Sequence, residues 1–199
     1  MITTNRRRQF GEVDDKIKII HPQWWHIKCV ADSANLNVVS INSWGSMSVK
    51  EVVSAPEGGT ITVSSVSIGP CFKVSKPGTY EFYATISHTG NTSVYYMFDC
   101  VYYVRLPKPY SSNYVLRPLF NLGPGGGTQH NRFDVYSINP NPPAGPNNDA
   151  LGALANNNHV YIYVPKGSIE NYINNADTKW RTMYDAGRLI EVDYKIIED

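Results

Sequence analysis

Histidines are the side chains here most suited to binding a metal ion or moving a proton. Two ligands on one helix face need H-x-x-x-H spacing, and a zinc protease needs H-E-x-x-H. Neither pattern occurs in this sequence. We therefore interpret the histidines as scattered surface or strand residues and predict no metal site and no cofactor. The residues concerned are His21, His26, His88, His130 and His159.

Nucleophilic catalysis has no visible carrier either. The sequence lacks a G-x-S-x-G elbow, and Cys29, Cys71 and Cys100 are widely separated, with no C-x-x-C pair. Each cysteine lies in or beside an apolar, strand-like segment, which favours a small buried hydrophobic residue. We expect three free thiols, with a Cys71–Cys100 disulfide as the alternative. The sequence predicts a protein that is not an enzyme.

Aromatic residues offer a different chemistry, because flat rings bury well against the apolar faces of sugar rings. Trp24 and Trp25 are adjacent, and a tyrosine-rich strand is expected over 93–104. Alternation along one strand places Tyr95 and Tyr103 mostly on the face opposite Tyr96. One face is expected to pack in the core and the other to form an interface. Core packing remains the alternative to a sugar-stacking platform.

Composition limits the partners. Charged residues make up 18% of the chain and the formal net charge is +1, so no long-range field attracts nucleic acid or an anionic membrane. The surface is expected to be rich in Asn, Ser, Thr, Gly and Tyr, as in β-rich surface and virion proteins. The longest apolar run, 94–104, is too short to span a bilayer as a helix. We predict no membrane partner and no specific nucleic acid.

The N-terminal residues 1–21 are predicted to form an arm. Arg6, Arg7 and Arg8 precede acidic residues rather than an apolar stretch, so we expect no secretory signal. Ile17 and Ile19 belong to a run too short to build its own core. Such an arm is expected to order on a neighbouring subunit.

Residues 22–106 are predicted to form an antiparallel, immunoglobulin-like β-sandwich. Their segments are β-branched or aromatic and are bounded by turn residues. The Pro77-Gly78 turn precedes one strand, and residues 88–91 are expected to close a hairpin between this strand and the next.

Residues 107–158 are rich in Pro, Gly and Asn, and short strands are expected at 114–120 and 132–138. Residues 159–199 are predicted to form a small α+β module. A strand over 159–164 leads to Ser168, a favourable helix N-cap, and an apolar stripe follows at helical spacing. The fold class is therefore mainly β: a sandwich followed by a small α+β C-terminal module.

The order of motifs over roughly residues 139–195 resembles the terminal unit of BspA-type leucine-rich-repeat surface proteins. In that family a strand leads to a VPKGS turn, a helix with a Tyr, a Trp and a final strand that caps the repeat stack. Here the turn is residues 164–168, followed by Tyr172, Trp180 and Leu189-Ile190. The resemblance implies a cap on a hydrophobic stack. The sequence shows no preceding array of repeats, so we expect the ladder to be missing.

The resemblance also implies a setting, since this module is common in gut anaerobes and in the phages that infect them. With no secretory signal expected, a virion structural protein of a crAss-like phage is the first hypothesis. Its partners would be other virion proteins, copies of itself among them, with a host-surface glycan as a further candidate. The alternative is an extracellular carbohydrate- or protein-binding module of a bacterial surface protein. The predicted contact residues are Arg6, Arg7, Arg8, Ile17, Ile19, Trp24, Trp25, Tyr95 and Tyr103.

Overall fold

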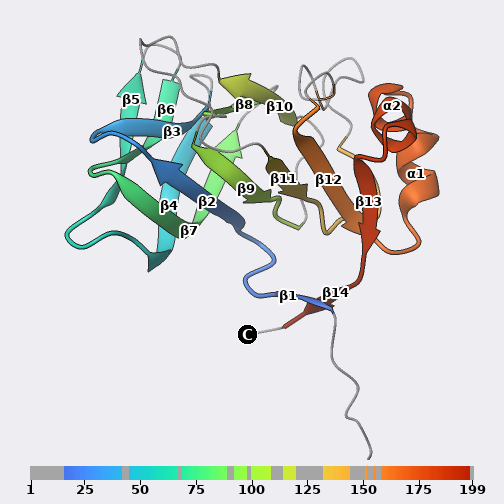
Figure 1. The fold of residues 1–199 in the computed structure, drawn as a ribbon, viewed down its shortest axis with the longest axis horizontal. Coiled ribbons are helices and arrows are strands. Elements are labelled where there is room, and N and C mark those ends of the chain that lie inside the picture. The colour runs from blue at the N-terminus through green and yellow to red at the C-terminus, as the bar shows by residue number, and fades with distance from the viewer. Residues whose placement is uncertain are drawn as a thin grey trace, which may run out of the picture.

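The computed structural model describes residues 16–41, 45–66, 69–88, 92–97, 100–108, 114–119, 132–143, 151, 155 and 158–197. Within these residues the chain forms fourteen strands and two short helices (Figure 1). The mainly β prediction is therefore confirmed, with a sandwich and a small α+β C-terminal part.

The larger sheet has seven strands and runs through both predicted parts of the chain. Its first four strands in spatial order pair in parallel, and the last three pair antiparallel with their neighbours. The order is β13 (Leu189–Val192), β12 (Val160–Pro165), β11 (Phe133–Tyr136), β9 (Val101–Arg105), β2 (Trp25–Ala31), β7 (Gly78–His88) and β4 (Gly45–Ser54).

A second sheet of five strands makes up the other layer of the sandwich. Four of its strands pair antiparallel, and β10 pairs in parallel with β8. The order is β10 (Tyr114–Leu119), β8 (Thr92–Met97), β3 (Leu36–Ile41), β6 (Gly69–Val74) and β5 (Ile61–Val66). The short strands expected at 114–120 and 132–138 are thus confirmed as β10 and β11.

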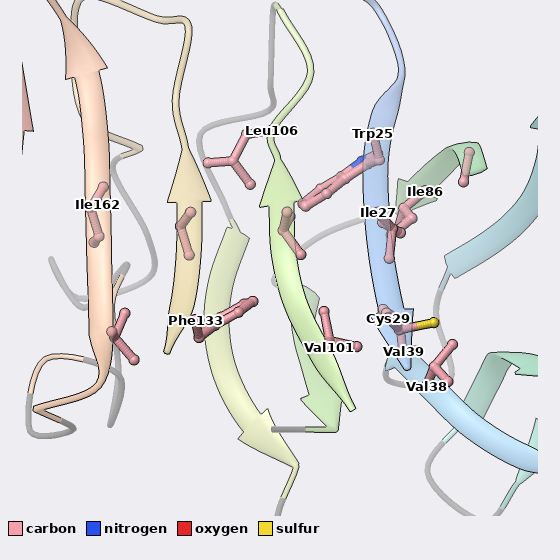
Figure 2. Close-up of a cluster of buried hydrophobic side chains, with 14 of the residues drawn as sticks. Trp25, Ile27, Cys29, Val38, Val39, Ile86, Val101, Leu106, Phe133 and Ile162 are labelled. Carbon is pink, nitrogen blue, oxygen red and sulfur yellow. The ribbon is translucent and has the colours of Figure 1, made fainter. Parts of the chain in front are cut away.

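The two sheets pack face to face through apolar side chains. Phe72 on β6 meets Phe82 on β7 edge to face, with ring centroids 5.3 Å apart. Both side chains belong to one continuous cluster of buried hydrophobic residues that spans the sandwich. Figure 2 shows part of this layer, where Ile162, Phe133, Val101 and Ile27 follow one another across neighbouring strands.

The predicted hairpin between the strands on either side of residues 88–91 was wrong. β7 lies in the seven-stranded sheet, whereas β8 lies in the five-stranded sheet. The single strand expected over 93–104 is also two strands, β8 and β9, one in each layer. A turn motif reports a change of direction and does not identify the partner strand.

The parallel strands β11, β12 and β13 form a short ladder with a constant spacing. Phe133 lies beside Val160, and Ile162 lies beside Leu189, so each rung is offset by 27 positions (133 to 160, 162 to 189). β9 adds a rung on the other side, with Val104 beside Val135.

These adjacent parallel strands were not expected from the sequence. Their pairing could not be predicted from the sequence, because the strands share alternation of apolar residues but no recurring motif. The sandwich and the C-terminal module also share one sheet, since β9 pairs with β2 on one side and β11 on the other. The apolar cluster likewise continues from the sandwich into the C-terminal helices.

Helices α1 (Ile169–Ile173) and α2 (Lys179–Asp185) connect β12 to β13 and lie at the β13 end of the molecule (Figure 1). They bury Tyr172 and Trp180, whose rings meet edge to face at 5.0 Å. Ser168 occupies the N-cap position of α1, but its hydroxyl donates to the Pro165 carbonyl rather than capping the helix. No helix in the described ranges is long and apolar enough to cross a membrane.

The N-terminal strand β1 (Ile17–Ile19) pairs in parallel with β14 (Tyr194–Ile196) in a separate two-stranded sheet. Ile17 lies beside Tyr194, and the side chain of Ile19 is 2% exposed. For residues 16–21 the prediction of an arm that orders only on another subunit was wrong, because the chain's own C-terminal strand supplies the pairing. Residues 1–15 lie outside the described residues.

Candidate binding site

The two faces of the seven-stranded sheet have opposite character, and alternation along each strand sets it. On β2, Trp25, Ile27 and Cys29 point into the core, so His26 and Lys28 point to the other face. The outer face collects aromatic and charged side chains that the apolar core could not accommodate. This outer face is the candidate site.

Aromatic rings follow one another across this face from β7 to β12. We call them the aromatic row, and the row crosses β7, β2, β9, β11 and β12 in the order of the sheet. The consecutive centroid distances are 4.4 Å for Tyr83–His26, 5.0 Å for His26–Tyr103, 5.0 Å for Tyr103–Tyr136 and 4.4 Å for Tyr136–Tyr163. The first and last pairs are stacked and the middle pairs are tilted or edge to face, all of which are favourable ring geometries.

A pocket of about 450 Å³ lies between this row and the N-terminal strand β1. Isoleucines and Lys18 on or beside the two-stranded sheet contribute to its lining, together with aromatic rings and cations of the seven-stranded sheet. Its lining residues are Ile17, Lys18, Ile19, Ile20, His26, Lys28, Tyr83, Tyr103, Arg105, Tyr136 and Ile197.

Glu81 organises the polar groups on β2. Its carboxylate lies 3.1 Å from Lys28 Nζ and 2.8 Å from His26 Nε2. Burial lowers the pKa of His26 to about 4, so the imidazole is neutral at pH 7 and its Nε2–H donates to the carboxylate. Burial raises the pKa of Glu81, but the hydrogen bonds from Lys28 and His26 outweigh this and leave it lowered. The ion pair at neutral pH is therefore between Lys28 and Glu81.

Arg105 is the most buried cation of the site, with 1% of its surface exposed. Its Nη2 donates to the main-chain carbonyls of His21 and Trp24 at 3.0 and 3.1 Å. Its guanidinium lies 5.8 Å from the centre of the Tyr83 ring. Among the described residues, Nη1 has no hydrogen-bond partner and no carboxylate forms an ion pair with this side chain. A buried guanidinium without a counter-ion is costly.

The phenols of the row stay protonated at neutral pH. Burial raises the pKa of Tyr136 to about 12, and burial also raises the pKa of Tyr103. Each hydroxyl is therefore a hydrogen-bond donor as well as an acceptor. Neither forms a hydrogen bond with another described residue, although both side chains line the pocket. Two polar groups at the pocket thus retain capacity for a ligand.

The structure brings part of the predicted set of contact residues to this site. Ile17 and Tyr103 line the pocket, and Trp24 stacks on His21 at 4.6 Å beside it. Tyr95 lies on β8 in the other sheet, so it cannot share a face with Tyr103. The side chain of Tyr95 lies outside the described part of the chain, as do Arg6, Arg7 and Arg8.

Two of the predicted contact residues are corrected by their burial. Trp25 is in the core because it alternates with His26, and 1% of its surface is exposed. Ile19 is buried between the two-stranded sheet and the rest of the same chain. Neither offers a side-chain surface to a partner, because each is already packed within the protein.

Sequence reasoning missed the polar members of the site. His26 was interpreted as a scattered histidine, and Lys28, Glu81, Arg105 and Tyr136 were not singled out. Alternation is the local signal, since His26 and Lys28 on β2 and Glu81 on β7 alternate with residues that are buried in the core. That signal assigns a face but cannot reveal which strands are neighbours.

A second surface lies at the open edges of the sandwich. β4 is the last strand of the seven-stranded sheet and β5 the last of the five-stranded sheet. Val52 and Val53 on β4 and Val63 on β5 are each close to half exposed. Two irregularities in the pairing of β4 with β7 lie at 49–51 and 52–54. Bulges of this kind protect an edge from strand addition, so side chains are the more available contact here.

The cysteines are buried and free, as expected from the sequence. Burial raises the pKa of Cys29 to about 12, which suppresses the reactive thiolate. Among the described residues, no three His, Cys, Asp or Glu side chains gather as a set of metal ligands. Searches against protein-family models, curated proteins and solved structures find no match to this chain.

Proposed function

We propose that this chain is a non-enzymatic structural protein of a virion that acts through protein–protein contacts. Its place would be in capsid decoration, a head fibre, the neck or the tail, beside other virion proteins and copies of itself. The observation that carries the proposal is the exposed apolar edge of the sandwich. Val52, Val53 and Val63 are each close to half exposed on the two edge strands, and exposed apolar side chains on edge strands favour contact with a neighbouring subunit.

The C-terminal part supports the setting. The strand, turn, helix and Trp motif that resembles a repeat cap is followed by a final strand, and both strands belong to a ladder of constant spacing. A cap closes the open end of such a stack and keeps it from joining further rungs. With this end closed, the exposed edge of the sandwich is left as the surface for assembly.

The edge is tested by charge substitution in the purified chain. V53K and V63K each place a cation on an edge strand where the side chain is already exposed, so folding should be retained. We expect sedimentation to show self-association that both variants weaken by about tenfold or more. Y184K, which adds the same charge at an exposed residue of α2, is the matched control. Equal association by all three variants would remove the edge from the proposal.

The setting is tested on the particle itself. Mass spectrometry of purified particles from the source culture should find this chain at a fixed ratio to the major capsid protein, and antibody labelling should place it at one location in micrographs. Detection on the bacterial surface, with none in particles, would overturn the virion proposal.

A second candidate is an extracellular carbohydrate- or protein-binding module of a bacterial surface protein. The aromatic row and its pocket favour it, because rings beside hydrogen-bonding side chains are the usual means of holding sugars. Neighbouring genes discriminate between the two candidates. Genes for portal or tail proteins support the first, and genes for polysaccharide use support the second.

A further inference from the structure

We infer that the pocket between β1 and the aromatic row binds a carboxylate-bearing sugar of the hexuronic acid class. This inference concerns the pocket and holds for either setting proposed above. It is carried by charge, by unfilled hydrogen-bonding capacity and by the shape of the lining.

The charge of the lining is positive. Lys18, Lys28 and Arg105 border the pocket, and no described lining residue is acidic. Glu81 neutralises one of these cations, since its carboxylate lies 3.1 Å from Lys28 Nζ. An anionic ligand therefore meets an excess of positive charge in a partly enclosed site, where salt screens the attraction less than at the surface.

Arg105 defines the kind of anion. Its Nη2 is committed to two main-chain carbonyls, which fixes the guanidinium plane, while its Nη1 has no hydrogen-bond partner among the described residues. A planar carboxylate matches the planar guanidinium, and charge-assisted hydrogen bonds of this type are about twice as strong as neutral ones. A ligand carboxylate would supply the counter-ion that no described carboxylate provides.

The phenols distinguish a sugar from an apolar acid. Tyr103 and Tyr136 line the pocket, and their hydroxyls form no hydrogen bond with other described residues. A fatty or aromatic acid would cover these groups without pairing them, which costs free energy. Sugar hydroxyls both donate and accept, so they pair with the phenols while the ring's apolar face packs on a tyrosine ring.

The shape is consistent with a small ring. Isoleucines on or beside the two-stranded sheet and aromatic rings of the seven-stranded sheet both line the pocket. A pyranose has two weakly polar faces and a polar rim, so it fits between apolar walls with its hydroxyls at the edge. The volume of about 450 Å³ is in the range of small-molecule pockets. The site is sized for one or two sugar units rather than for a folded partner.

Calorimetric titration of the full chain tests the inference, with sodium D-glucuronate as the probe. Three other ligands serve as comparisons. D-glucose has the sugar ring without the carboxylate, and sodium hexanoate has a carboxylate without the sugar ring. A short peptide with a free C-terminal carboxylate represents a protein ligand. We expect glucuronate to bind about tenfold more tightly than each of the three, because only it satisfies both the cations and the phenols. Glucose, hexanoate or the peptide binding as tightly as glucuronate would overturn the inference.

Variants locate the site. K28Q should weaken glucuronate binding about tenfold and Y136F a few-fold, since each removes one hydrogen-bonding group that lines the pocket. R132Q is the matched control, because Arg132 lies beside the same row, paired with Asp134 at 2.7 Å, but does not line the pocket. R105Q should abolish binding, and its melting curve shows whether the fold survives. An R132Q effect as large as that of K28Q, or no effect of both K28Q and Y136F, would overturn the assignment.

Discussion

The two faces of the seven-stranded sheet come from the same strands and differ by a single step along each. On β2, Trp25 and Ile27 are buried in the core. The alternating residues His26 and Lys28 point to the other face, where both contact Glu81. Burial of apolar groups is non-directional and stabilises in proportion to area. The opposite face instead positions rings and charges at defined distances. The comparison shows that one face buries apolar area, whereas the other holds polar and aromatic groups in defined positions.

The groups that destabilise the fold lie on the outer face. Arg105 is buried there without a described counter-ion, and His26 is held neutral by burial. Groups of this kind destabilise a fold unless something else offsets them. The apolar face supplies that offset, because its cluster continues from the sandwich into the C-terminal helices. Substitutions that remove apolar contacts should therefore lower stability more than substitutions on the outer face.

The largest effect is expected for Trp180→Ala in the apolar cluster. The side chain is 1% exposed, and its removal should lower the free energy of unfolding by about 4 kcal/mol, since it leaves a large cavity. Chemical denaturation measures the change. Tyr184→Ala on the same helix, where the side chain is 43% exposed, should cost less than about 1 kcal/mol. Equal losses for the two variants would contradict the burial difference between them.

Next comes Ile19→Ala, which tests whether β1 belongs to this chain's own fold. Ile19 is buried and its strand pairs with β14, so we expect a loss of about 3 kcal/mol. The neighbouring Ile20 is 41% exposed and Ile20→Ala is the control, with an expected loss under about 1 kcal/mol. An unchanged melting transition for Ile19→Ala would restore the predicted arm that orders only on a partner.

A comparable effect is expected from pH, through His26 on the outer face. Burial lowers its folded pKa to about 4 from the ordinary 6.5, so the unfolded chain binds more protons between these values. The contribution of this group to stability is therefore full above pH 6.5 and falls as pH drops toward 4, by about 3 kcal/mol.

Urea unfolding at pH 7.5 and 4.5 measures that loss. His26→Gln should reduce the difference between the two pH values, because it removes the titrating ring and keeps a donor for Glu81. His159→Gln removes an exposed histidine elsewhere in the chain and is the control for the loss of one imidazole. A wild-type pH dependence in His26→Gln would show that other groups control it.

The smallest effect is expected from reductant. Cys29, Cys71 and Cys100 are buried free thiols, so adding reductant should leave the melting temperature unchanged. Alkylation under denaturing, non-reducing conditions should add three labels by intact mass. A single label would indicate the Cys71–Cys100 disulfide considered from the sequence.

Local patterns in the sequence determined the mainly β class, the strands β10 and β11, the burial of Trp180 and the buried state of the cysteines. They suffice because alternation, helical spacing and turn residues act over a few positions, where the chain itself sets the geometry. The same alternation separates Trp25 from His26, which assigns each to a face before any strand partner is known.

Only the tertiary structure decided which strands are neighbours. β7 and β8 adjoin in sequence yet lie in different sheets, whereas β1 pairs with β14 across nearly the whole chain. Parallel pairing at an offset of 27 leaves no local trace (133 to 160, 162 to 189), since the rungs share only alternation. The pocket depends on these pairings, because Arg105, Lys28 and Tyr136 come from three strands. Register is fixed by burial of the whole apolar face at once, and no short segment carries that information.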